Sequence, residues 1–280
     1  MRRALLVLGM ILVAASMAFI GCSDDEDCPT CVTTAQKAVM FGGGQLDDGE
    51  LEFYCYLIGI DGLIPDIDSV KVDGQKADME SGYGEGGGMV WAEYEGPAGG
   101  LDSGDDITVV VYTPTGTSSV TFTLLEDEVD DAQAIGWEMD YPYDTVALDQ
   151  SIEITWNSIP NADWYFFDYD YSFDSAGTNV YRGNKEIYMT DTTFTIPASE
   201  TGYNGYYYID ITAVAGPSPD ASTGNVTGDV VKGMVISTCY NSFQIYLGTG
   251  DAWPVAAAPN PMENDKLRAV EVLMNMHLNK

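Results

Sequence analysis

The chain has 280 residues, 45% of them hydrophobic and 11% aromatic, which is enough to bury one large core or two ordinary ones. Its formal net charge is −33. Such an acidic protein repels nucleic acid, whose binding needs Lys and Arg to neutralise phosphates, and it repels anionic lipid as well. These bulk properties exclude a nucleic-acid partner, and any membrane attachment must come from something other than surface charge.

The N-terminus predicts export. Residues 1–22 read MRRALLVLGMILVAASMAFIGC, with two arginines, a long apolar run, and a small residue before a cysteine. This is the layout of a secretory signal, and the run is slightly short for a bilayer span, which needs roughly 20 apolar residues. The residues Phe19-Ile20-Gly21-Cys22 resemble the lipobox of bacterial lipoproteins. That resemblance implies a signal peptide over 1–21 and a lipid anchor on Cys22, with an uncleaved anchor or an ordinary cleaved signal as the alternatives.

Residues 22–36 are expected to form a lipidated acidic tether. Ser23 stands where an aspartate marks inner-membrane retention in bacterial lipoproteins, so the resemblance implies attachment to the bacterial outer membrane. The acidic run that follows resembles a signal for surface exposure, although a solvated tether facing the periplasm stays open. Cys28 and Cys31 have redox-motif spacing but lack the helix N-terminus that lowers a thiol pKa. A disulfide in the tether or an intermolecular link is therefore expected.

Beyond the tether the hydrophobic pattern has period two, which predicts an all-β body of two tandem antiparallel sandwiches. The first unit, over 37–128, resembles bacterial immunoglobulin-like modules in pattern only. Its expected strands are 37–41, 50–60, 69–72, 89–94, 107–113 and 118–125. In the second of these, Leu51, Phe53, Cys55 and Leu57 share one face, which is expected to be the core face.

The second unit, over 132–250, carries a more specific pattern. Strands are expected around Ser151–Trp156, around 164–171 with Tyr165 and Phe167 facing the core, at 192–197, and around Tyr207. These segments resemble strands of a fibronectin type III domain, and the resemblance implies that Tyr207 is its corner tyrosine. Two further strands are expected at 234–238 and 242–247, and which of them closes the sandwich stays open.

The C-terminal residues 251–280 predict a linker and a short amphipathic helix. Asn260-Pro-Met-Glu263 has the signature of a helix start, with a capping Asn, a first-turn Pro and a Glu three residues later. The broad apolar face of the helix must be buried, either on the chain's own sandwiches or on a partner.

No catalytic residues are nominated. The only histidine, His277, lies on the predicted helix between apolar residues, and a hydrolytic triad or a zinc site needs more than that. A glycosidase would need a specific pair of carboxylates, and 44 acidic residues offer no particular pair. The body is therefore expected not to be an enzyme, and a carboxylate-based hydrolase is the alternative from another class.

Two features remain as candidate binding sites. Asp168, Asp170 and Asp174 alternate along the chain and are candidate calcium ligands. The aromatic residues between them indicate an extended strand, so a solvated face protecting a sheet edge is the better interpretation of the three carboxylates. Tyr206 and Tyr208 are expected to face outward beside Asp210 if Tyr207 faces inward. Exposed tyrosines beside carboxylates suit sugar rings or protein partners, whereas ordinary cross-strand pairing would also explain them.

The sequence thus predicts a non-catalytic outer-membrane lipoprotein that acts in binding, adhesion or envelope assembly. Its partners would be the membrane, through the lipid anchor, and a protein or glycan at the cell surface. No cofactor is expected apart from calcium. A carbohydrate-binding accessory lipoprotein is the alternative within the same compartment.

Overall fold

The computed structural model describes residues 37–47, 50–84, 87–97, 99–125, 129, 133–134, 145–146, 148–175, 178–202, 205–228, 230–247, 270 and 274. The predicted signal peptide, the tether and Cys22, Cys28 and Cys31 lie outside these residues, as do His277 and most of the predicted helix.

The fold is all-β, as the period-two pattern predicted. The strands are β1 (Ala38–Asp47), β2 (Glu50–Gly59), β3 (Ser69–Val72), β4 (Gln75–Lys76), β5 (Asp78–Gly84), β6 (Gly87–Pro97), β7 (Asp106–Thr113), β8 (Gly116–Thr123), β9 (Gln133–Ala134), β10 (Thr145–Val146), β11 (Ile152–Thr155), β12 (Trp164–Ser175), β13 (Thr178–Met189), β14 (Thr193–Ile196), β15 (Gly205–Ala215), β16 (Thr227–Gly228) and β17 (Val231–Leu247). All six strands expected in the first unit are present, and β4, β5, β9, β10, β13 and β16 are additional to the expected strands.

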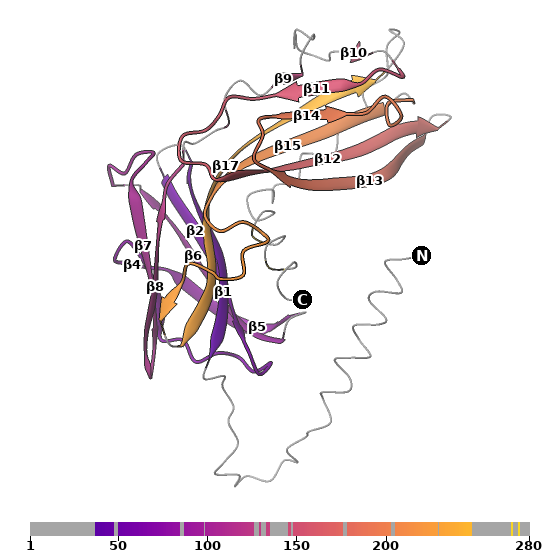
Figure 1. Cartoon of the computed structure of the whole chain (residues 1–280). Helices are drawn as coiled ribbons and strands as arrows, with labels where there is room; N and C mark the ends of the chain where they lie inside the picture. The colour runs from indigo at the N-terminus through magenta and orange to yellow at the C-terminus, as the bar shows by residue number, and fades with distance from the viewer. Residues whose placement is uncertain are drawn as a thin grey trace, which may run out of the picture. The chain divides into compact units, whose positions relative to one another are not determined.

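The strands form three sheets (Figure 1). A nine-stranded sheet has the order β13-β12-β15-β17-β1-β2-β6-β5, with β10 also paired to β17. The order β16-β8-β7-β3-β4 makes a five-stranded sheet, and β14-β11-β9 makes a three-stranded one. The two smaller sheets each pack on the large sheet, so the chain is two β-sandwiches with one sheet in common.

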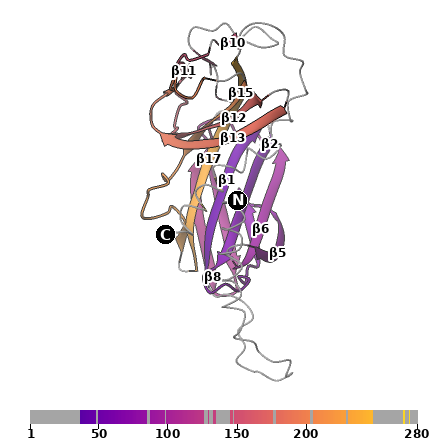
Figure 2. The same cartoon turned by 90° about the vertical axis from the view of Figure 1, so that its right-hand side faces the viewer.

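The strand β17 joins the two sandwiches. Its first part, Val231 to Ser237, pairs in parallel with β1, and its second part, Ser237 to Leu247, pairs antiparallel with β15. Figure 2 shows β17 beside β1 and continuing toward β15. The two strands expected at 234–238 and 242–247 are therefore one strand of 17 residues. Residues 231–237, which lie between two strand segments of the second sandwich in the sequence, therefore complete the large sheet of the first sandwich.

Alternation along β17 fixes which face of the large sheet each core occupies. Val231 and Val235 lie in the first core, and Cys239 and Ile245, at the same parity, lie in the second. Because successive side chains of a strand point to opposite faces, both cores lie on one face of the shared sheet. We call the opposite face the outer face.

The core of the first sandwich follows the predicted alternation of β2. Leu51, Phe53, Cys55 and Leu57 are all buried in it. The strands β7 and β8 meet in a two-residue hairpin at Pro114-Thr115, with Thr113 paired to Gly116. The second core contains Tyr165 and Phe167 of β12 and the fully buried Tyr207 of β15, as their spacing predicted.

A third apolar cluster lies on the outer face. It consists of Phe41, Ile58, Trp164, Phe166, Val214, Met234, Ile236 and Val270, and we call it the outer cluster. Its members come from both sandwiches and from the C-terminal segment. Val270 and Met274 are helical, and Val270 is buried in the cluster. The helix was expected to be buried either on the chain's own sandwiches or on a partner, and Val270 shows the first of these.

Candidate functional site

The outer face of the second sandwich carries aligned carboxylates. Asp168 of β12 pairs in register with Glu186 of β13 on one side and with Asp210 of β15 on the other. Three carboxylates from neighbouring strands therefore form one row across the sheet. Like charges directly opposite one another destabilise strand pairing, so the row is not what sheet stability alone would favour.

The next row on the same face adds polar and aromatic groups. Asp170 of β12 pairs with Asn184 on one side and with Tyr208 on the other. Asp170, Asn184 and Tyr208 are half-buried, whereas Asp168 is 6% exposed. Tyr207, the neighbour of Tyr208 on β15, is fully buried in the second core. Because successive side chains of a strand point to opposite faces, Tyr208 faces outward, as expected.

The structure corrects one interpretation of this acidic strand. The carboxylates of Asp168 and Asp170 were expected to protect a sheet edge, yet β12 lies between β13 and β15 and is hydrogen-bonded on both sides. The edge interpretation is therefore wrong, although the expected extended backbone is present. The partner strand β13 carries Arg182-Gly183-Asn184, a polar stretch whose pattern gave no sign of a strand.

Calcium binding by Asp168, Asp170 and Asp174 stays a prediction. Within the described ranges, no group of three or more His, Cys, Asp or Glu side chains is placed to hold a metal ion. The side chains of Asp174 and Tyr206 lie outside what is described.

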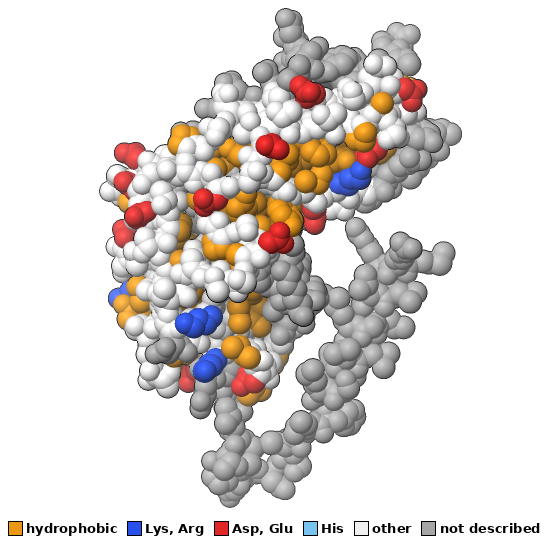
Figure 3. All heavy atoms as spheres, in the orientation of Figure 1, with side chains coloured by type: hydrophobic (Ala, Val, Ile, Leu, Met, Phe, Trp, Pro, Cys, Tyr) orange, Lys and Arg blue, Asp and Glu red, His pale blue; other side chains and the backbone are white. Residues whose placement is uncertain are grey.

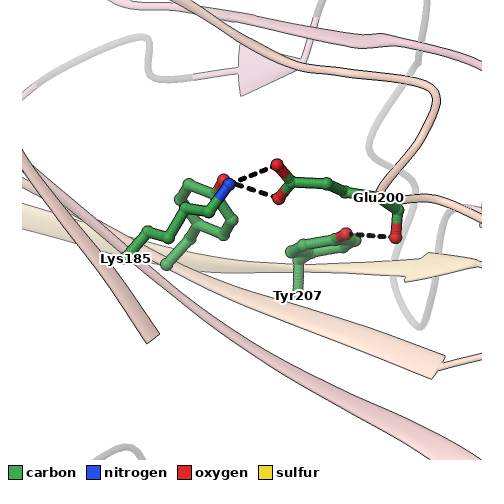
Figure 4. A network of polar contacts seen from close by, with 4 residues as sticks. Lys185, Glu200 and Tyr207 are labelled. Carbon is green, nitrogen blue, oxygen red and sulfur yellow. Dashed lines mark hydrogen bonds and ion pairs between the residues drawn. The ribbon is translucent and has the colours of Figure 1, made fainter. Parts of the chain in front are cut away.

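A second polar group closes the second sandwich near the loop after β14. The hydroxyl of Tyr207 donates to the carbonyl oxygen of Glu200 at 2.9 Å, which is the hydrogen bond expected of a corner tyrosine. Tyr169 donates to Glu200 Oε2 at 2.9 Å, and Lys185 forms an ion pair with the same carboxylate (Figure 4). Lys185 Nζ also lies 5.7 Å from the ring centroid of Tyr169.

The electrostatics of this group favour structure over catalysis. Burial raises the pKa of the Tyr169 phenol above its usual range, and the hydrogen bond and negative charge of Glu200 raise it further. A phenol held protonated in this way is a poor general base. Its hydroxyl instead tethers the Glu200 loop to the core.

The outer face of the first sandwich is aromatic. Tyr56 of β2 pairs with Trp91 of β6 on one side and Phe41 of β1 on the other. A Cβ atom at Gly82 of β5 would lie 3.3 Å from the Trp91 ring, so that ring lies over the glycine. The half-buried Tyr54 and Tyr56 adjoin the outer cluster. Sequence reasoning missed this surface because it depends on the pairing of β2 with β1 and with β6.

Both described cysteines are buried thiols. Cys55 lies in the first core and Cys239 in the second, so they do not pair. Burial raises the pKa of the Cys55 thiol to about 12, which makes it inert as a nucleophile at neutral pH. Among the described residues, no helix has the length and apolar character needed to cross a membrane.

The acidic side chains are spread out on the face drawn in Figure 3. Red side chains there stand singly or in small groups, between apolar ones. The acidic side chains drawn on this face therefore form no single large patch.

The class of protein defined by the fold is an all-β chain with two β-sandwiches that share one sheet. No family model and no curated protein matches the sequence. Solved structures that resemble it include a chimeric titin Z1Z2 functionalised with an exogenous decorin peptide, at 12% identity and a TM-score of 0.21, covering 77% of this chain and 100% of that chain. The full ectodomain of mouse nectin-like molecule 4 has 8% identity and a TM-score of 0.22, covering 78% and 67%. A titin immunoglobulin tandem has 11% identity and a TM-score of 0.20, covering 72% and 95%. At these TM-scores the likeness says nothing about a ligand or partner.

Proposed function

We propose that the chain is a non-catalytic, lipid-anchored protein of the bacterial outer membrane that binds a partner at the cell surface. The N-terminal sequence supports the location, since Cys22 ends a secretory signal with a lipobox-like sequence. The outer face of β13, β12 and β15 supports the binding role. The sandwiches supply a rigid support for a surface, and the proposal assigns them no reaction.

One observation carries the binding proposal: the register places Glu186, Asp210 and Asp170, which reach the surface, around the buried Asp168 and beside Tyr208. Carboxylates accept hydrogen bonds from hydroxyl or ammonium groups, and a tyrosine ring offers flat apolar area beside them. A sugar presents hydroxyls around an apolar ring face, so this combination favours a glycan. A basic protein surface is the other partner with matching chemistry.

Binding is tested with the purified mature chain on a glycan array, with calcium and with a chelator. Tyr208→Ala and Asp170→Asn should each lose the glycans that the unaltered chain retains. Tyr83→Ala is the matched control, because Tyr83 is 71% exposed and lies on β5, in the other sandwich. If Tyr208→Ala and Tyr83→Ala retain glycans equally well, the outer face of the second sandwich is not the glycan-binding surface. A chain that retains no glycan under either condition would overturn the glycan assignment.

The location is tested by a mass spectrum of the mature N-terminus from native membranes. The expected chain begins at Cys22 and carries the mass of its fatty chains, whereas Cys22→Ala should remain without them. Material that retains Met1, or that begins elsewhere with an unmodified thiol, would contradict the anchor. Surface labelling of intact cells then separates an outward-facing protein from one that faces the periplasm.

The competing function is hydrolysis by carboxylates. A broad glycosidase and peptidase screen addresses it with the same protein. Turnover that disappears in Asp168→Asn or Asp210→Asn would replace the binding proposal with an enzymatic one.

A further inference from the structure

The outer cluster is built from both sandwiches and covered by the C-terminal segment. Phe41 and Ile58 come from β1 and β2, and Trp164 and Phe166 come from β12. Met234 and Ile236 of β17 lie between these two groups. Val270 is fully buried against the cluster, and Met274, one helical turn further, packs on it partly buried.

The residue opposite Val270 is a glycine, and the reason is space. A Cβ atom at Gly43 would lie 2.8 Å from Val270 Cγ2, closer than side chains approach. The next neighbours, Ile236 Cγ1 and Tyr54 Oη, would both be at 3.6 Å, which is ordinary contact. Of the three atoms nearest to the position of this Cβ atom, only Val270 Cγ2 is too close to allow a side chain at position 43.

We propose that the C-terminal segment around Val270 is an intramolecular latch that docks on the outer cluster and fixes the two sandwiches to each other. The occupant of this surface is the chain's own segment. Without it, apolar side chains of both sandwiches would form one exposed patch, which soluble proteins avoid. The latch is independent of the ligand proposed above, because Val270 contacts the outer cluster whatever the acidic rows bind.

The latch can be tested by its resistance to trypsin. Lys266 and Arg268 stand directly before Val270 in the sequence, so cleavage after them reports release of the segment. In the full mature chain, Val270→Asp should accelerate this cleavage several-fold, whereas Val270→Ile should leave it near the original rate. Equal cleavage rates in the original chain and Val270→Asp would overturn the proposal.

A pair of small substitutions tests the contact itself. Gly43→Ala should accelerate cleavage, because its methyl group collides with Val270 Cγ2. In a Val270→Ala background the same change should add little, since the colliding atom is gone. Gly82→Ala is the matched control: it also adds a methyl group to a strand of this sheet, but next to Trp91, and should not affect cleavage. Full additivity of Gly43→Ala and Val270→Ala would contradict the contact.

A disulfide identifies which chain supplies the segment. Gly43→Cys with Val270→Cys, in a chain that also has Cys28→Ser and Cys31→Ser, places two thiols within bonding reach. The buried Cys55 and Cys239 are not expected to compete. On a non-reducing gel the expected product is a cross-linked monomer, absent from either single cysteine variant. A cross-linked dimer would assign the surface to a second copy, and the absence of any cross-link would reject docking; either result overturns the latch.

Discussion

The two cores lie on the same face of one sheet, yet they are built from different chemistry. The first core is mainly aliphatic, and its two large rings, Phe53 and Phe122, stack with centroids 6.1 Å apart. Glycine makes room for them, since a Cβ atom at Gly44 would lie 2.6 Å from Phe122 Cζ. The packing of the five-stranded sheet on the large sheet therefore depends on how closely apolar side chains, such as that of Phe122, approach the backbone of the large sheet.

The second core is aromatic and ends in hydroxyls. Tyr171 stacks on Tyr207 with centroids 4.5 Å apart, and Trp156 meets Tyr165 edge-on at 5.5 Å. The hydroxyl of Tyr207 donates to Glu200, and that of Tyr165 accepts from the backbone N–H of Ile159 at 2.9 Å. These rings fill the core and also hold the loops around it. The first sandwich therefore depends on volume, and the second depends on volume together with a set of directed hydrogen bonds.

The largest effect is expected where volume alone is removed. Phe122→Ala in the first core should lower the free energy of unfolding by about 4 kcal/mol, because a large buried ring leaves a cavity over Gly44. Urea denaturation measures it, with Ile60→Ala, at a site 63% exposed, as a control that changes stability little. A loss below about 2 kcal/mol would mean that the first core collapses around the gap and is less tightly packed than described.

The next effect is a loss of stability at alkaline pH. The pKa of Cys55 is raised from 9.0 to about 12 by burial in the first core. The unfolded chain therefore releases this proton above pH 9 while the folded chain keeps it. The stabilisation that comes from the neutral Cys55 thiol is complete below pH 9. It falls by about 1.4 kcal/mol per pH unit as the pH rises toward 12.

Comparison with Cys55→Ala isolates this contribution, because other groups also titrate in that range. The difference in unfolding free energy between the original chain and Cys55→Ala should shrink as the pH rises from 9 to 12. A difference that stays constant would mean that the Cys55 thiol is not held in an apolar site.

How far the sequence predicts this fold depends on the range of the interactions. Strand faces follow from neighbours two residues apart, and the predicted faces of Leu51, Phe53, Tyr165 and Phe167 are confirmed. These strand faces are local, so the pattern contains them. The corner position of Tyr207 is what the resemblance to a fibronectin type III domain implies, and the hydrogen bond from its hydroxyl to Glu200 is present.

Features set by distant pairing were not predictable in this way. The strand β17 has Tyr240, Asn241 and Ser242 at its middle, a polar stretch that favours a break. It continues because β15 pairs with it through this stretch, while β1 pairs with its first part. The outer cluster exists only as a consequence of that pairing, so no local pattern announces it. For the same reason the row of Glu186, Asp168 and Asp210 could not be foreseen from residues spread over three strands.

A smaller effect tests the directed bonds of the second core. Tyr207→Phe keeps the ring and removes the hydroxyl that donates to Glu200, so the free energy of unfolding should fall by about 1 kcal/mol. Tyr94→Phe is the counterpart in the first sandwich, where the hydroxyl makes no hydrogen bond among the described residues. Its effect should be within about 0.5 kcal/mol of zero. Equal losses in thermal or urea unfolding would remove the contrast between the two cores.

The smallest effect is expected at the rim of the same group. Lys185 pairs with Glu200, but the two side chains are 52% and 28% exposed, so water and salt screen their attraction. Lys185→Met keeps most of the aliphatic stem and should cost less than about 1 kcal/mol of unfolding free energy. The loss should shrink further in 1 M salt, where the Debye length is about 3 Å. Urea unfolding at low and high salt measures both values. A loss well above about 1 kcal/mol that disappears in 1 M salt would show that the ion pair, and not the tyrosine hydroxyls, holds the Glu200 loop to the second core.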